Sequence, residues 1–138
     1  MAETVKLEVV TPARAVLDVA TAEVVQLPGR DGMFGVLPAH APLMATLGPG
    51  IVEYMIDPDK DVRGRMVVAG GFAIVRDDVV TVLAETAELP EEIDAHAAQA
   101  QLADAKAALG TAVSPDEEQA LHDRVALAEA RIEAVARA

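Results

Sequence analysis

The sequence predicts a β-sandwich of two antiparallel sheets followed by an antiparallel α-helical hairpin. In the first part of the chain, apolar residues recur in short bursts between turns, and Val5, Leu7 and Val9 alternate with polar neighbours as in a half-buried strand. Further along, glycine becomes rare while alanine, glutamate, glutamine and leucine dominate, which is typical of helices. We therefore divide the chain into a β-sandwich domain at residues 1–87 and a C-terminal helical hairpin at residues 88–138.

Bursts of apolar residues identify the expected strands. They lie at residues 5–9, 16–19, 24–27, 43–47, 51–56, 66–69, 72–75 and 79–83. About eight to ten strands at this spacing are typical of two stacked antiparallel sheets. Turn-forming residues predict two hairpin tips, one at residues 57–60 and one at residues 76–78.

The first expected helix follows Leu89 and Pro90. Glu91, Glu92 and Asp94 stand in its expected first turn, where carboxylates meet the positive end of the helix dipole. The helix is expected to continue to Leu109, where the next residue is a glycine that favours a stop.

The second expected helix has a sharper start. Ser114 suits the N-cap, Pro115 suits the first helical position, and Glu117 completes a capping box. Apolar residues then keep helical spacing along one face, at Leu121, Val125, Ala128, Ile132 and Val135. Residues 110–113 form the expected loop of the antiparallel hairpin.

The hairpin has few large apolar residues with which to stabilise itself. Each contributes roughly 1.5 to 3 kcal/mol at full burial, whereas backbone ordering costs about 1 to 2 kcal/mol for every residue. Alanine-rich faces allow close helix packing but bury little apolar area. We therefore predict that the hairpin needs the sandwich or a partner to stay folded.

Composition excludes several classes of function. The chain has 138 residues and a net charge of −12, which opposes binding to nucleic acid. It has no cysteine, so a thiol nucleophile and a disulfide scaffold are excluded. The N-terminus does not resemble a signal or transit peptide, and no apolar run approaches the roughly 20 residues of a membrane span. Direct membrane insertion is therefore not expected.

No group of residues has the pattern of an active site. Ser114, the only serine, is explained by helix capping, and His40, His96 and His122 lack the paired spacing of a zinc site. Gly70 and Gly71 are not followed by the lysine and hydroxyl residue of a phosphate-binding loop. We predict no catalytic residue, no metal site and no enzymatic activity.

A family resemblance rests on two blocks of the sequence. The first is the segment 26–50, QLPGRDGMFGVLPAHAPLMATLGPG, and the second is the segment 70–87, GGFAIVRDDVVTVLAETA. The residues that carry the first block are Asp31, Gly32, Gly35, Val36, Pro38, His40, Ala41, Pro42 and Leu43. Together the blocks resemble the epsilon subunit of F-type ATP synthases.

This resemblance implies a non-catalytic subunit of the central stalk, which is part of the rotor. Such a subunit couples ion-driven rotation of a membrane-embedded ring to ATP synthesis. Its implied partners are the gamma subunit, the rotor ring, and the alpha and beta subunits of the catalytic head when the hairpin is extended. The implied location is peripheral, on the cytoplasmic face of a bacterial plasma membrane.

The resemblance also implies three sets of site residues. Candidate contacts with the rotor ring are Arg30, Asp31, Met33 and His40, of which Met33 occupies a place that is often acidic in relatives. Candidate nucleotide contacts are Ile93, Asp94 and Ala98, but Ala97 replaces the arginine of the family's ATP motif. No cofactor is expected, and any ATP binding is predicted to be weakened, because a guanidinium is well suited to phosphate.

Candidate contacts of an inhibitory tail are Arg124, Arg131 and Arg137. Residues 88–138 contain four basic and eleven acidic residues, so like charge opposes insertion of the hairpin against an acidic partner. Weak or absent inhibition of ATP hydrolysis is therefore expected.

Two other classes of function stay open from the residues alone. One is a free-standing β-sandwich module that binds a small ligand or nucleotide in a pocket. The other is a small hydrolase that uses two carboxylates with separated pKa values. Its candidate acids, which hairpin-tip chemistry explains better, are Asp57, Asp59, Asp61, Asp77 and Asp78.

Overall fold

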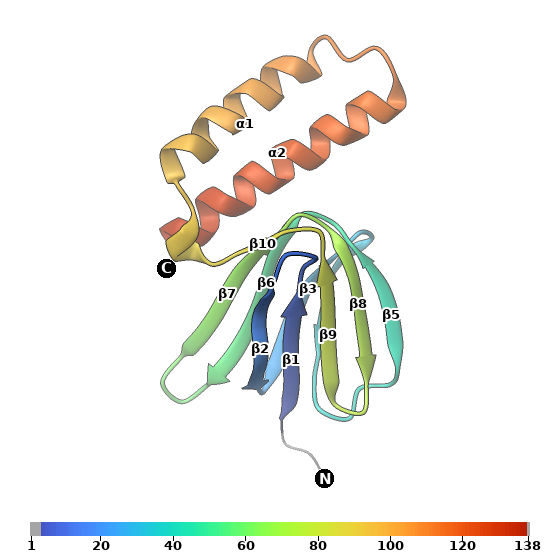
Figure 1. The fold of residues 1–138 in the computed structure, drawn as a ribbon, viewed down its shortest axis with the longest axis vertical. Coiled ribbons are helices and arrows are strands. Elements are labelled where there is room, and N and C mark those ends of the chain that lie inside the picture. Colours follow the sequence, from blue (N-terminus) through green and yellow to red (C-terminus); the bar gives the residue numbers. More distant parts are fainter. Residues whose placement is uncertain (1–3, 138) are drawn as a thin grey trace.

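The chain folds into a β-sandwich with two α-helices at one end (Figure 1). The computed structural model describes residues 4–137, with the side chains of residues 18–20 excepted. The strands are β1 (Val5–Val10), β2 (Ala15–Ala22), β3 (Val24–Gly29), β4 (Gly32–Val36), β5 (Leu43–Leu47), β6 (Gly50–Asp57), β7 (Val62–Val68), β8 (Gly71–Arg76), β9 (Val79–Ala84) and β10 (Ala87–Glu88). The predicted sandwich and hairpin are confirmed.

Hydrogen bonding runs continuously through the sandwich in the order β10-β7-β6-β3-β5-β8-β9-β1-β2. Strand β3 joins the two layers, because residues near its start pair with β6 and Gly29 at its end pairs with Leu47 of β5. Strand β4 lies off this path and pairs with β3. Across the core, β2 packs against β6 and β1 packs against β3.

One strand pair differs from the expected antiparallel arrangement. Strands β1 and β9 run parallel, with Leu7 opposite Val80 and Val9 opposite Val82. A short turn forces its two strands to be antiparallel, but β1 and β9 are far apart in the sequence and no turn connects them. Their relative direction is therefore set by the tertiary arrangement and not by a connecting turn.

The core follows the alternation read from the sequence. Val5, Leu7 and Val9 of β1 are fully buried, while Lys6 between them is exposed. The other fully buried large side chains include Leu27, Leu47, Val52, Met66, Val68, Val80 and Val82. Period-two burial positions β1, β8 and β9 against one apolar interior, whereas β6 and β7 each bury three consecutive residues.

Aspartates form the two predicted hairpin tips. The Asp57 carboxylate accepts hydrogen bonds from the amides of Asp59 and Lys60, and so closes the β6–β7 turn. Asp77 and Asp78 have φ values of 53° and 60°, the left-handed conformation required in the tight β8–β9 turn. These contacts assign the aspartates a structural role.

The first helix begins later than the sequence predicted. Glu92 belongs to a 3₁₀ turn, η1 (Pro90–Glu92), and Ile93 is extended. Helix α1 (Ala95–Leu109) then starts with Asp94 as its N-cap, whose carboxylate accepts from the Ala97 amide at 3.1 Å. The placement of these acids in the first turn of the helix was therefore wrong, because the chain must turn away from the sheet before the helix can begin.

The second helix begins as predicted. Helix α2 (Pro115–Ala136) has Ser114 as its N-cap, and the Ser114 hydroxyl accepts from the Glu117 amide at 3.1 Å. The carboxylate of Glu117 accepts from the amide of Val113 at 3.4 Å, one residue before the position that a capping box uses.

Helix α2 mediates the contact between hairpin and sandwich, and α1 packs on α2 as the outer helix (Figure 1). Helix α2 lies on β6, β7 and η1. A small apolar cluster supports it, formed by Val67, Ala130 and Ala134 with half-buried Ile51, Ile93 and Leu127. Within residues 4–137, neither helix has the combination of length and apolar character that a membrane span requires.

Candidate functional site

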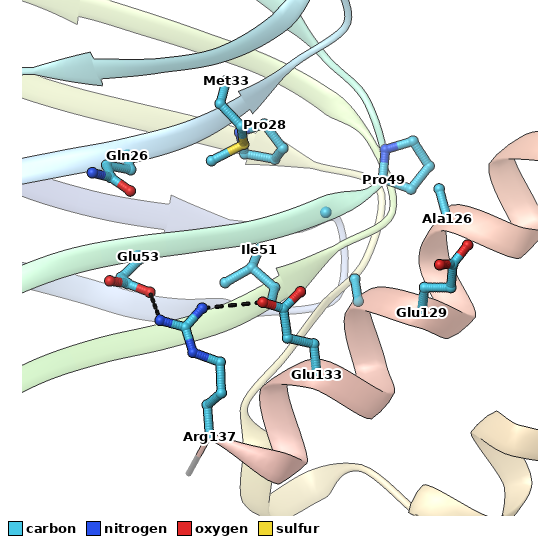
Figure 2. A pocket seen from close by; sticks show the side chains of 12 residues that line it. Gln26, Pro28, Met33, Pro49, Ile51, Glu53, Ala126, Glu129, Glu133 and Arg137 are labelled. Atoms are coloured by element: carbon cyan, nitrogen blue, oxygen red, sulfur yellow. Dashed lines mark hydrogen bonds and ion pairs between the residues drawn. The ribbon is translucent and has the colours of Figure 1, made fainter.

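A groove separates the sandwich from α2 (Figure 2). It encloses about 460 Å³. Pro28, Met33 and Ile51 form an apolar wall on the sandwich, whereas Glu129 and Glu133 line the side formed by α2. We call this hollow the seam groove. It shows that the hairpin is not packed continuously against the sheet.

Glu53 lies at one end of the seam groove and is the only charged residue that is buried among the described residues, with 9% of its surface exposed. Its carboxylate accepts from Arg63 Nη1 at 2.8 Å and from Arg65 Nε at 2.9 Å. Burial by itself raises the pKa of Glu53, but the hydrogen bonds from Arg63 and Arg65 outweigh that effect and hold the pKa below its usual value. Glu53 therefore stays ionised against the core.

Arg137, at the end of α2, joins this cluster. Its guanidinium lies between Glu53, 3.5 Å away, and Glu133, 3.1 Å away (Figure 2). The carbonyl oxygen of Arg137 accepts a hydrogen bond from Arg65 Nη1 at 3.0 Å. Both the side chain and the backbone at the end of α2 are thus attached to the sandwich.

Arg30 makes a second attachment near the middle of α2. From the turn between β3 and β4, its guanidinium donates to both carboxylate oxygens of Asp123, at 2.7 and 3.3 Å. The hydrogen bond to Asp123 raises the pKa of Arg30. Gln119, one turn earlier on α2, donates to the same carboxylate at 3.0 Å and orients it.

Arg131 makes a third attachment, which joins three elements. Its guanidinium donates to Glu88 of β10 at 2.8 Å and to Gln101 of α1 at 2.9 Å. At the same end of the molecule, Arg14 in the β1–β2 turn forms a two-point ion pair with Glu92 of η1, at 2.8 and 2.9 Å. Arginine and carboxylate pairs therefore hold both the hairpin and the segment that leads into it.

The candidate nucleotide residues lie beside Arg131. A hollow of about 220 Å³ is bordered by Glu88, Glu92, Asp94 and Arg131, and Ile93, Ala97 and Gln101 complete its wall. Ala98 is 1% exposed and is packed inside the hairpin. Three carboxylates surround one guanidinium that already pairs with Glu88, so the hollow has little positive charge for a phosphate.

The structure does not bring the four candidate ring contacts together. Arg30, Asp31 and Met33 lie near the end of the sandwich that faces the hairpin. His40 lies beyond the other end of β4, in a loop where the amide of Ala39 donates to the carboxylate of Asp78. Met33 and Leu37, however, are both exposed along the β4 edge that leads towards His40. The guanidinium of Arg30 pairs with the carboxylate of Asp123 on α2.

The three candidate tail arginines also differ. Arg131 and Arg137 are engaged by carboxylates of the sandwich. Arg124 is exposed and lines a small hollow with Gln101 and Leu127, on the side of α2 that faces α1.

The sequence did not identify the carboxylates that pair with Arg30, Arg65 and Arg131. Glu53 and Arg65 lie directly opposite each other on β6 and β7, and opposite charges on two strands of one hairpin are a signal for such a pair. A register shift between Met55 and Asp57 means that counting from the turn would not have aligned them. Asp123 and Glu88 carry no comparable signal, because their distances from Arg30 and Arg131 depend on how the hairpin docks.

One face of the sandwich exposes large apolar side chains. Met44 of β5, Phe72 of β8 and Leu83 of β9 are 71%, 51% and 43% exposed. Phe72 lies opposite Leu83 in the sheet, and Met44 lies opposite Ile74, so these residues form one continuous surface. We call it the outer apolar face. Apolar surfaces of this kind are typical of protein interfaces.

Comparison with known proteins identifies the family. Residues 4–90 match the family described as the beta-sandwich domain of the ATP synthase delta/epsilon chain. The ATP synthase epsilon chain of Rhodospirillum centenum is 38% identical over 139 residues, covering 99% of this chain and 94% of that one. The chain belongs to the ATP synthase delta/epsilon chain family. The family resemblance predicted from the sequence is therefore confirmed.

A second relative and a solved structure are also similar to this chain over nearly its whole length. The ATP synthase epsilon chain of Paramagnetospirillum magneticum is 40% identical and covers 99% of this chain and 100% of its own length. A chain in the structure of the Euglena gracilis mitochondrial ATP synthase has a TM-score of 0.80 at 23% identity, covering 99% of this chain and 83% of that one. This likeness in fold includes the hairpin as well as the delta/epsilon sandwich.

Proposed function

We propose that the chain is a non-catalytic subunit of the central stalk of an F-type ATP synthase and couples ion-driven rotation of the ring to ATP synthesis. The observation that carries the proposal is similarity over nearly the whole chain, sandwich and hairpin together, to relatives named ATP synthase epsilon chain. The chain would be held peripherally, on the cytoplasmic face of a bacterial plasma membrane, by its partner subunits.

Inverted membrane vesicles from a strain that lacks the chain test this function. Addition of the purified chain is expected to restore ATP synthesis driven by the ion gradient and to restore retention of the catalytic head. Full ATP synthesis in vesicles without the chain would contradict the proposal.

The outer apolar face is the proposed contact with the gamma subunit. Met44, Phe72 and Leu83 offer apolar surface on the regular strands of the sandwich, a stiff base for transmitting torque. Replacing Phe72 with aspartate should weaken binding to purified gamma subunit at least about tenfold, because the charge must be desolvated. Val113→Asp, at an exposed apolar residue in the hairpin loop, is the matched control and should bind normally.

The β4 edge from Met33 to His40 is the proposed contact with the rotor ring. Met33 and Leu37 are exposed along it, and the His40 loop is held by the Ala39 to Asp78 hydrogen bond. The chain lacks cysteine, so a single cysteine at Leu37 can be crosslinked to the ring in the assembled complex. Crosslinking from Leu37 but not from Val113 is expected, and equal yields at both positions would reject the contact.

Nucleotide binding to the isolated chain is proposed to be weak. The three carboxylates beside Arg131 oppose an anionic ligand, and Ala97 offers no charged group. Millimolar ATP should leave the Tm of the chain unchanged. A clear rise in the Tm of the unmodified chain would contradict this view, and an Ala97→Arg variant is expected to show a larger rise than the unmodified chain.

Inhibition of ATP hydrolysis by the hairpin is also proposed to be weak. Arg131 and Arg137 are already paired within the chain, and the hairpin is acidic. The test compares hydrolysis by the head and gamma subunit with no addition, with the full chain, and with a version that ends at Pro90. Strong inhibition by the full chain that truncation relieves would overturn the proposal.

A further inference from the structure

We propose that the seam groove binds a small amphipathic organic cation, with its apolar chain on the sandwich wall and its ammonium group against Glu129 of α2. The groove encloses about 460 Å³, and small-molecule sites in proteins occupy about 300 to 1,000 Å³. The inference rests on the groove itself and does not depend on the function proposed above.

The sandwich side of the groove is apolar and is built on regular strands. Pro28 lies on β3, Met33 on β4 and Ile51 on β6, and the first two are directly opposite each other in the sheet. Met33 is 61% exposed, so most of its surface is not covered by the rest of the described chain. An apolar ligand chain placed on this wall would remove that surface from water, which is favourable.

Small residues on α2 keep the groove open. Ala126 and Ala130 share one face of the helix with Glu129 and Glu133, because residues three and four positions apart lie side by side. Each alanine carries only a methyl group, so α2 does not fill the space beside the sandwich wall. A larger side chain at Ala126, which is half-buried, would occupy that space.

The charges that line the groove favour a cation. They are three carboxylates, of Glu53, Glu129 and Glu133, and the guanidinium of Arg137. Glu53 already accepts hydrogen bonds from arginines of β7, and Glu133 pairs with Arg137 at 3.1 Å. Glu129 forms no ion pair within residues 4–137. A cation that enters the groove therefore meets a carboxylate that has no cationic partner.

The same charges disfavour other classes of ligand. An anion would face the carboxylates on α2, while the guanidinium of Arg137 is already shared by Glu53 and Glu133 (Figure 2). A wholly apolar ligand would cover Glu129 and Glu133 without replacing their hydrogen bonds to water, which costs free energy. A ligand with one cationic part and one apolar part matches both walls of the groove.

The two ends of the groove differ, and this difference sets the orientation of the ligand. Figure 2 shows Glu53 and Arg137 together at one end, and Glu129 near Ala126 towards the other end. The guanidinium of Arg137 repels a second cation at its own end. The ammonium group is therefore expected beside Glu129, with the apolar chain across Ile51.

A nuclear magnetic resonance titration of the full chain tests the site with three probes of equal chain length. Hexylammonium is cationic, hexanol is neutral and hexanoate is anionic at pH 7, and the amide chemical shifts of Ile51 and Ala130 report binding. We expect saturable shifts with hexylammonium, a Kd at least about threefold lower than that of hexanol, and no shift with hexanoate. A Kd for hexylammonium no lower than that of hexanol, or saturable binding of hexanoate at these amides, would overturn the inference.

Two substitutions separate the charge from the space. Glu129→Gln should raise the Kd of hexylammonium to that of hexanol and leave the Kd of hexanol unchanged. Ala126→Leu should abolish the shifts with both probes, because the larger side chain fills the groove. Glu118→Gln, at an exposed acid on the same helix but outside the groove, is the matched control and should bind hexylammonium normally.

Either of two results with these variants would also overturn the inference. One is an unchanged Kd of hexylammonium in Glu129→Gln, and the other is unchanged binding by Ala126→Leu. Circular dichroism of each variant checks that the helices and strands remain formed.

Discussion

Arg30 and Asp123 form a two-point ion pair although 93 positions separate them in the chain, with oxygen–nitrogen distances of 2.7 and 3.3 Å. Arg30 belongs to the tight β3–β4 turn, and Asp123 belongs to the middle of α2. The pair therefore connects the sandwich to the hairpin at a point remote from the covalent link between them.

Limited proteolysis of the full chain should cut the hairpin before the sandwich. Only a small apolar cluster packs between the hairpin and the sandwich, whereas the strands share a fully buried core. Asp123→Asn should speed hairpin cleavage several-fold, and Asp116→Asn, an exposed acid in the first turn of α2, should change it less. Equal resistance of residues 88–138 and of the sandwich would show that the hairpin is stable by itself.

Ala39→Gly should stabilise the protein. Ala39 has φ of 65°, a conformation that costs a residue with a Cβ atom about 1 kcal/mol relative to glycine. Its amide hydrogen bond to Asp78 would be kept, since only the methyl group is removed. Urea denaturation should show a gain approaching that amount, and Ala41→Gly, two residues away, should instead be neutral or destabilising.

Gly71→Ala should destabilise the protein strongly. Gly71 has φ of 136°, and an added Cβ would collide with the Leu83 carbonyl oxygen on the neighbouring strand. The backbone cannot move away without breaking the β8–β9 ladder, so a loss of about 3 kcal/mol or more is expected. Gly35→Ala is the matched control, because its nearest neighbour would be 3.9 Å from the new atom. Equal stability of the two variants would contradict the close strand packing at Gly71.

Glu53 should make stability depend on pH. Its folded pKa lies below its unfolded value, so the contribution is fully present above the unfolded pKa and is lost as pH falls through the folded pKa. Glu53→Gln should therefore destabilise the protein more at pH 7 than at low pH, near the folded pKa. Chemical denaturation at both values measures this difference, and the same loss at each would exclude an ionised Glu53.

Ser114→Ala should weaken the start of α2. The Ser114 hydroxyl accepts from the Glu117 amide, and loss of an N-cap costs about 1 kcal/mol. Ser114→Asp should retain most of the stability, because its carboxylate can accept the same bond. Hydrogen exchange at the first amides of α2 reports the effect directly, and equal protection in both variants would contradict a capping role.

Much of the local structure follows from the sequence alone. The alternation at Val5, Leu7 and Val9 predicts a strand with one buried face, and Ser114 with Pro115 predicts the start of α2. These features depend on neighbours within a few residues, which the chain order specifies completely. The family resemblance also rests on local motifs, so it could be recognised before any packing was known.

Tertiary structure alone decided the relationships between distant elements. The parallel pairing of β1 with β9, the partner of Arg30 and the cluster of arginines around Glu53 all depend on how sheet layers and helices meet. Arg30 shows the physical reason most clearly. Its motif predicts a turn, but a guanidinium pairs with whichever carboxylate packing brings within about 3 Å, and here that carboxylate belongs to the hairpin.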